Sequence, residues 1–62
     1  MDYYRTYYKL YSNASEDKRK ASKEHWLKIY RESLNSGKDD TLTTHSALTL
    51  ATILLADEDL KN

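Results

Sequence analysis

The 62-residue sequence contains no cysteine, no proline and no phenylalanine, and it has a single glycine, Gly37. The absence of cysteine excludes disulfides and thiolate metal sites, and it is typical of proteins in a reducing compartment. With no proline and one glycine, the chain lacks the composition of a disordered tail and has few residues that interrupt helices. These absences favour a small all-α protein.

The shortness of the chain limits how much surface it can bury. At this length, folding removes only about 60% of the surface that the unfolded chain exposes, so further stabilisation is needed. Disulfides and thiolate-bound metals are excluded, which leaves association with another chain. We therefore predict a helical-bundle homodimer that contains four or six helices in all.

No segment of the sequence has the pattern of a targeting or membrane-spanning element. The first residues lack a basic stretch followed by an apolar one, and no apolar run approaches the length of a membrane span. We expect a soluble, cytoplasmic protein with no membrane association, organised as one helical domain over residues 1–62.

The net charge of zero conceals an uneven distribution of charge. Residues 3–38 contain nine Lys or Arg and four Asp or Glu, whereas residues 39–62 contain one Lys and five Asp or Glu. Such a separation can favour antiparallel packing within the chain, self-association, or the binding of an acidic partner by the basic part.

The first predicted element is a short amphipathic helix over residues 3–11. A period of 3.6 residues places five tyrosines and Leu10 on one face and leaves Arg5, Thr6 and Lys9 on the other. The tyrosines of this face are Tyr3, Tyr4, Tyr7, Tyr8 and Tyr11. A strand over the same residues would mix charged and aromatic side chains on one face, which argues against β structure.

The second predicted element is a long helix over residues 14–35. Charges of alternating sign recur at every fourth residue, at Glu16, Lys20, Glu24, Lys28 and Glu32. Opposite charges at this spacing stabilise a helix by about 0.2 to 0.5 kcal/mol per pair. We expect Asn13 and Glu16 to form a capping box at its start, and Asn35-Ser36-Gly37 to end it.

The apolar side chains of this long helix lie in its C-terminal half. They are Trp26, Leu27, Ile29, Tyr30 and Leu34. In the N-terminal half, Arg19 and Lys23 occupy the same arc. We therefore expect the first half either to project beyond the core or to cover it with the stems of long side chains.

The third predicted element is an apolar helix over residues 43–56. Its apolar arc is formed by Ala47, Leu48, Leu50, Ala51, Leu54 and Leu55. Small residues one turn apart allow another helix to approach closely, and Asp40 or a threonine is expected to cap the start. The threonines and Ile53 leave a strand as the alternative, although it would lack a partner strand. Residues 57–62 are predicted to be a frayed acidic tail.

No pattern typical of an enzyme, a cofactor site or a metal site is present. His25 and His45 lack carboxylate or cysteine neighbours at ligand spacing, and we interpret them as surface or loop residues. The acids at 57–59 are interpreted as a solvated tail, and the loop at 35–40 lacks the spacing of a calcium loop. We therefore predict a non-enzymatic protein without a cofactor, metal or small-molecule substrate.

The tyrosine-rich face is the strongest candidate for binding a partner. A buried phenol whose hydroxyl lacks a partner costs about 1 to 3 kcal/mol, so five on one face are not all expected in a core. Interfaces are enriched in Tyr, Trp and Arg. The predicted partner interface comprises Tyr3, Tyr4, Tyr7, Tyr8, Tyr11, Trp26 and Tyr30.

These features favour a small interaction protein of regulatory type, such as a phage, plasmid or mobile-element factor that binds a host protein. The alternative is a dimeric nucleic-acid-binding protein that uses the basic part of the long helix. Its contacts would be Lys18, Arg19, Lys23 and Arg31. A third hypothesis, of another class, is structural self-assembly. The zero net charge and the apolar third helix disfavour nucleic-acid binding.

Overall fold

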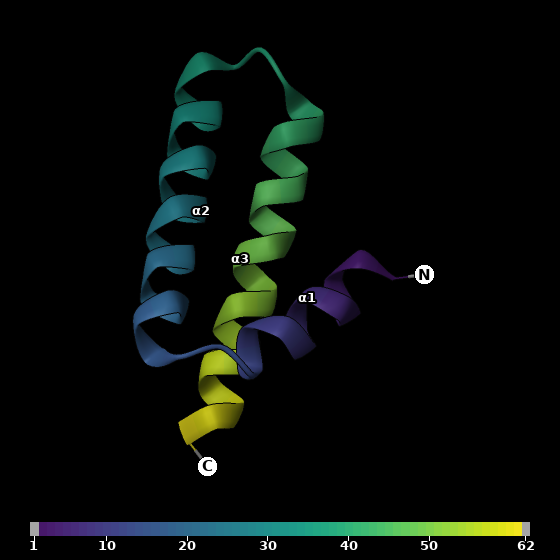
Figure 1. Ribbon diagram of the computed structural model, residues 1–62. Helices are drawn as coiled ribbons and strands as arrows, with labels where there is room; N and C mark the ends of the chain where they lie inside the picture. The colour runs from purple at the N-terminus through teal and green to yellow at the C-terminus, as the bar shows by residue number, and fades with distance from the viewer. Residues whose placement is uncertain (1, 62) are drawn as a thin grey trace.

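The computed structural model describes residues 2–61, which form three α-helices and no strand (Figure 1). Helix α1 spans Tyr3–Ser12, α2 spans Glu16–Ser36 and α3 spans Asp40–Lys61. The predicted all-α class and the order of the three helices are confirmed. Within residues 2–61, no helix is long and apolar enough to cross a membrane.

Helix α3 is longer than predicted at both ends. It begins before residue 43 and continues past residue 56, so the acidic segment that was predicted to fray is helical through Lys61. Residues 1 and 62, the outer limits of the predicted domain, lie outside the described residues.

The helices form an antiparallel hairpin that is crossed by a third, shorter helix. Figure 1 shows α2 and α3 side by side, with the loop between them at one end. Helix α1 crosses the C-terminal half of α3 at a steep angle, and both α1 and α2 make their main contacts with α3 (Figure 1). Helix α3 is therefore the central element, and parts of its circumference lie beyond the reach of both neighbours.

The start of α2 differs from the prediction. Ser15 is the N-cap residue, and its hydroxyl accepts a hydrogen bond from the backbone N–H of Lys18 at 3.3 Å. Asn13 instead lies at the end of α1, where its side-chain amide donates to the carbonyl of Lys9 at 2.9 Å. The predicted capping box was wrong because the unpaired carbonyls at the end of α1 engage Asn13.

The predicted turn at the end of α2 is confirmed. Gly37 has a φ of 62°, in the left-handed region, and its N–H donates to the carbonyl of Ser33 at 3.1 Å. Helix α3 is then capped one residue earlier than expected, because Asp39 rather than Asp40 accepts a hydrogen bond from the N–H of Leu42 at 3.0 Å.

The buried core is small, and half of the buried side chains described are those of serine or threonine. Its apolar members are Tyr11, Ile53 and Ala56. The buried polar residues are Ser33, Ser46 and Thr49. Partly buried side chains pack against the apolar members, namely Tyr7, Tyr8, Trp26 and Leu50. A core of this size contributes little apolar burial, as expected for so short a chain.

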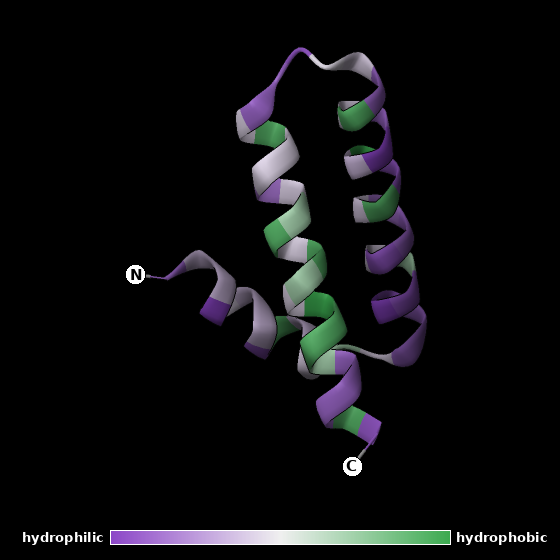
Figure 2. Ribbon diagram, turned by 180° about the vertical axis from the view of Figure 1, so that it is seen from behind, coloured by the Kyte–Doolittle hydropathy of each residue, from purple (hydrophilic) through white to green (hydrophobic). Residues whose placement is uncertain are grey.

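The buried side of α3 is its hydroxyl-bearing side. The hydroxyl of Ser46 donates to the carbonyl of Leu42 at 2.8 Å, and that of Thr49 donates to the carbonyl of His45 at 2.8 Å. Both hydroxyls therefore find acceptors within their own helix. In Figure 2, apolar residues colour much of the middle of the α3 ribbon green. Ile53 is buried and Leu50 packs against the core, whereas Leu48, Leu54 and Leu55 are exposed.

The alternating charges of α2 do not form the predicted ion pairs. Within residues 2–61, ion pairs with N–O distances up to 4.0 Å join Lys23 to Asp57 and Lys61 to Glu58. The alternating side chains between residues 16 and 32 are all exposed. Exposed pairs gain little Coulomb energy in water and lose side-chain entropy, which explains why spacing alone did not produce contacts.

Candidate interaction surface

The tyrosine face of α1 packs against α3 within the chain. Tyr11 is buried, Tyr4, Tyr7 and Tyr8 are partly buried, and Tyr3 is 41% exposed. The predicted interface thus lies largely in intramolecular contact, and whether its exposed edge meets another protein stays a prediction.

Three of these phenols form hydrogen bonds with side chains of α3. The Tyr4 hydroxyl pairs with Nδ1 of His45 at 3.0 Å. Tyr8 donates to Asp59, and Tyr11 donates to Oδ1 of Asp57 at 2.7 Å. The hydroxyls that were expected to lack partners in a core are therefore satisfied by α3, including two carboxylates of the acidic segment.

His45 of α3 lies among aromatic rings that belong to α1 and α2. Its ring centroid is 5.0 Å from that of Tyr3, 5.7 Å from that of Tyr4 and 5.3 Å from that of Trp26. His45 was interpreted as a surface or loop residue, and it is instead a partly buried residue of a helix, on the same side of α3 as Thr49. His25, on α2, is exposed and contacts only the edge of Trp26 among the described rings.

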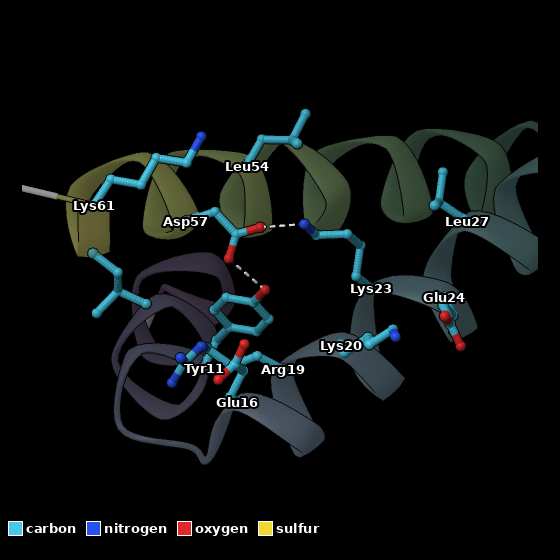
Figure 3. Close-up of a pocket in the computed structure, with 11 residues that line it drawn as sticks. Tyr11, Glu16, Arg19, Lys20, Lys23, Glu24, Leu27, Leu54, Asp57 and Lys61 are labelled. Atoms are coloured by element: carbon cyan, nitrogen blue, oxygen red, sulfur yellow. Dashed lines mark hydrogen bonds and ion pairs between the residues drawn. The ribbon is translucent and has the colours of Figure 1, made fainter.

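Asp57 connects the three helices at the opposite end of this contact. Figure 3 shows its carboxylate between the ammonium group of Lys23 from α2 and the hydroxyl of Tyr11 from α1. Burial alone would raise the pKa of Asp57, but Lys23, Tyr11 and the nearby charge of Arg19 together hold it below its ordinary value. The carboxylate therefore remains ionised and acts as a junction of the fold.

The tyrosines at this junction are held in their neutral form. Burial raises the pKa of Tyr11, and the hydrogen bond that it donates to Asp57 raises it further. The hydrogen bond to Asp59 is the main cause of the raised pKa of Tyr8. Both phenols therefore act as hydrogen-bond donors, which suits a structural role better than proton transfer at neutral pH.

The four predicted nucleic-acid contacts do not form one basic cluster. Lys23 pairs with Asp57, and Arg19 donates to the backbone carbonyl of Ala14. Lys18 and Arg31 are exposed, but 13 residues of helix separate them, which corresponds to about 20 Å along the axis. This separation gives little support to phosphate binding, which stays a prediction.

An open groove of about 790 Å³ lies beside Asp57 and is lined by residues of all three helices (Figure 3). Its walls include Leu27, Leu54 and Leu60, with lysines and Arg19 at its rim. The least exposed carboxylate in its wall is that of Asp57, which pairs with Lys23 and accepts a hydrogen bond from Tyr11. Among residues 2–61, no group of three or more His, Asp or Glu side chains is placed to hold a metal ion.

The most apolar exposed area of α3 is formed by side chains that occupy one face of the helix. We call this area the leucine surface, and it consists of Ala47, Leu48, Ala51, Leu54 and Leu55. The three leucines are 46%, 61% and 58% exposed, respectively. No Asp, Glu, Lys or Arg occurs between Asp40 and Asp57, so the surface is uncharged along its length. A contiguous exposed apolar face of this kind is typical of a protein interaction site.

Comparison with known proteins provides no family assignment. No family model matches the sequence, and neither a curated protein nor a solved structure shows significant similarity to it. Function must therefore be inferred from the arrangement of the side chains.

Proposed function

We propose that this chain is a non-enzymatic protein–protein interaction protein of regulatory type, and that its partner binds the leucine surface with an apolar helical face. The carrying observation is the exposure of Leu48, Leu54 and Leu55 on an uncharged face of the central helix. Complete burial of a leucine contributes about 1.5 to 3 kcal/mol. Covering three that are half exposed would therefore supply about 1 kcal/mol for each.

The proposal moves the contact from the tyrosine face of α1 to α3. A partner on the tyrosine face would compete with the hydrogen bonds that Tyr4, Tyr8 and Tyr11 make with α3. The leucines have no comparable contacts to lose. A partner can therefore cover them without disturbing the packing of the chain, and this difference favours the leucine surface.

The regulatory, non-enzymatic role is supported by the state of the polar side chains. Asp57, the least exposed acid in the groove, is already engaged by Lys23 and Tyr11. The phenols near it are donors in structural hydrogen bonds. These groups hold the helices together and are not free for catalysis. In so small a protein, this favours a role in recognition through an exposed surface.

The experiment is affinity capture with tagged chain as bait, comparing the native protein with Leu55→Lys. Leu10→Lys is the matched control, because Leu10 is 67% exposed on α1 and receives the same change of charge. We expect a bound protein to be retained by the native bait and by Leu10→Lys, and to be lost from Leu55→Lys. Circular dichroism must show equal helicity for all three.

A Tyr4→Ala, Tyr8→Ala bait tests the tyrosine face in the same experiment. Binding that survives Leu55→Lys and is lost only from the tyrosine variant would contradict the assignment to α3. Binding that is the same for every bait would contradict a specific apolar interface altogether.

A further inference from the structure

We infer that the protein bound to the leucine surface is a second copy of this chain, and that the two α3 helices pair antiparallel about a two-fold axis at Ala51. This inference rests on the proposed function, because both concern the same surface. It adds the identity of the partner and the register of the contact.

The first argument is the symmetry of the leucine surface about Ala51. Ala47 and Leu55 lie four residues to either side of it, and Leu48 and Leu54 lie three residues to either side. A two-fold axis at Ala51 then places Leu48 against Leu54 of the second copy, and Ala47 against Leu55 of the second copy. Self-complementarity of this kind is what a two-fold interface requires.

The second argument concerns size. The two copies of Ala51 meet at the axis, where small side chains allow the helix backbones to approach closely. Ala47 likewise leaves room for the larger Leu55 of the second copy, while Leu48 and Leu54 of the two copies meet as an aliphatic pair. Dense packing of this kind is what makes apolar contact favourable.

The third argument concerns charge and sets the direction. A parallel pair would place the acidic ends of both helices, Asp57, Glu58 and Asp59, side by side, where like charges repel. The antiparallel pair separates these ends. Each one then lies opposite residues 43–45 of the other α3, which carry no Asp or Glu, and Asp39 and Asp40 lie beyond them.

The fourth argument concerns stability and distinguishes a second copy from an unrelated protein. Among residues 2–61, the buried apolar residues are Tyr11, Ile53 and Ala56, which is a small core for a sequence with no cysteine. A partner that stabilises the fold must be present whenever the chain is made. A second copy meets this condition, whereas an unrelated protein meets it only when both are made together.

Pairing through this surface leaves the contacts within each chain intact. Helices α1 and α2 pack mainly on other sides of α3, where Ser46, Thr49 and Ile53 are buried, and Leu54 at the edge of the surface lines the groove beside Asp57. The two copies can therefore associate as folded units, without rearrangement of the tyrosine hydrogen bonds.

The first measurement is sedimentation equilibrium of the full chain over a wide concentration range. We expect the native protein to be a dimer at high concentration and to dissociate on dilution. Leu55→Lys should weaken the dimer by about 30-fold or more, as for a central interface residue. Leu10→Lys should leave the dissociation constant unchanged.

The second measurement uses the absence of native cysteine. In Ala51→Cys, the two introduced thiols meet at the axis and should form an intermolecular disulfide rapidly under mild oxidation. Lys28→Cys, on the exposed face of α2, is the matched control and should cross-link far more slowly. Both changes are at exposed positions, so both variants should keep the native helicity.

The outcomes separate this inference from the proposed function. A native chain that is monomeric at every concentration, together with equal cross-linking of the two cysteine variants, would overturn the inference. If a different protein were still captured in a manner that depends on Leu55, the proposed function would stand alone. A dimer that persists in Leu55→Lys would also overturn the inference, because its interface would lie elsewhere.

Discussion

The tyrosine face of α1 and the leucine surface of α3 use polarity in opposite ways. On α1 the aromatic side chains that carry hydroxyls turn toward the protein, and Tyr11 is buried among them. On α3 the aliphatic leucines turn toward solvent, while Ser46 and Thr49 are fully buried. The apolarity of a face therefore does not by itself determine whether that face is buried within the chain.

Side-chain size explains this arrangement. The rings of Tyr7, Tyr11 and Trp26 are large, and they need small side chains opposite them to pack without voids. Ser46, Thr49 and Ala56 supply a shallow side of α3 that can receive them. Leu48 and Leu55 lie on the exposed side of α3, and Leu54 lies at its edge, where it lines the groove beside Asp57.

The largest expected effect tests the two sides of α3 with similar deletions. Ile53→Ala removes a fully buried side chain and should cost about 2 to 5 kcal/mol of the free energy of unfolding. Leu55→Ala, two residues on, should change it by less than about 0.5 kcal/mol where the chain is monomeric. Chemical denaturation monitored by circular dichroism at low concentration measures both, and equal losses would show that Leu55 is covered within the monomer.

The next effect tests the phenol contacts of α1. Tyr11→Phe keeps the ring but removes the donor to Asp57, and should cost about 1 to 2 kcal/mol. Tyr30→Phe is the control, because the Tyr30 hydroxyl makes no hydrogen bond within residues 2–61, and it should be near neutral. If both variants unfold at the native denaturant concentration, the phenol hydroxyl has no structural role.

A smaller effect concerns acid stability at the junction of α1 with α3. The pKa of Asp57 is lower in the folded chain than its ordinary value, so its ionised form stabilises the fold above about pH 4. This contribution is lost as the pH falls through the folded-state pKa. In Lys23→Gln, the acid-induced loss of stability should begin at a higher pH than in the native chain. The substitution should lower the free energy of unfolding near neutral pH by less than about 1 kcal/mol, because the pair is partly exposed.

Acid titration monitored by circular dichroism measures this shift. Lys20→Gln is the control, since Lys20 is exposed and has no ion pair within the described residues. Identical acid transitions in the two variants would show that Lys23 does not stabilise the ionised form of Asp57.

The smallest effect is expected for a buried hydroxyl of α3. Ser46→Ala removes a group that donates only to carbonyls of its own helix, at Leu42 and Thr43. The change leaves no hydrogen-bonding group of another helix without a partner, and alanine favours helix formation. The free energy of unfolding, measured by thermal denaturation, should therefore change by less than about 0.5 kcal/mol. A loss comparable to that of Ile53→Ala would mean that this hydroxyl organises contacts between helices.

Local sequence patterns predicted the number, order and type of the helices. The 3.6-residue period of the tyrosines and the turn at Gly37 are properties of short segments, and both were confirmed. The apolar arc of the third helix was also visible. Its position relative to the other helices was not, because periodicity describes one helix and burial depends on its neighbours.

The residues missed by sequence analysis act through contacts that are distant in the chain. From the sequence, Asp57 and Asp59 were interpreted as part of a solvated tail. In the structure they accept hydrogen bonds from Tyr11 and Tyr8 of α1. His45 resembled a surface residue, yet its spacing of four from Thr49 and eight from Ile53 places it on the buried side. That spacing was a usable indication, whereas the acids had no local one.

The hydroxyls of Ser46 and Thr49 have a consequence for how α3 is oriented about its own axis. Because their acceptors lie on the same helix, turning α3 would not break those hydrogen bonds, and it would bring the leucines toward the core. The contacts that oppose such a rotation include those that the α1 phenols make with His45, Asp57 and Asp59. From α2, the Lys23–Asp57 ion pair and the Ser33–Thr43 hydrogen bond oppose it as well. Tyrosine in place of phenylalanine thus helps to fix the rotational position of α3, which contributes to the uniqueness of the fold in addition to its stability.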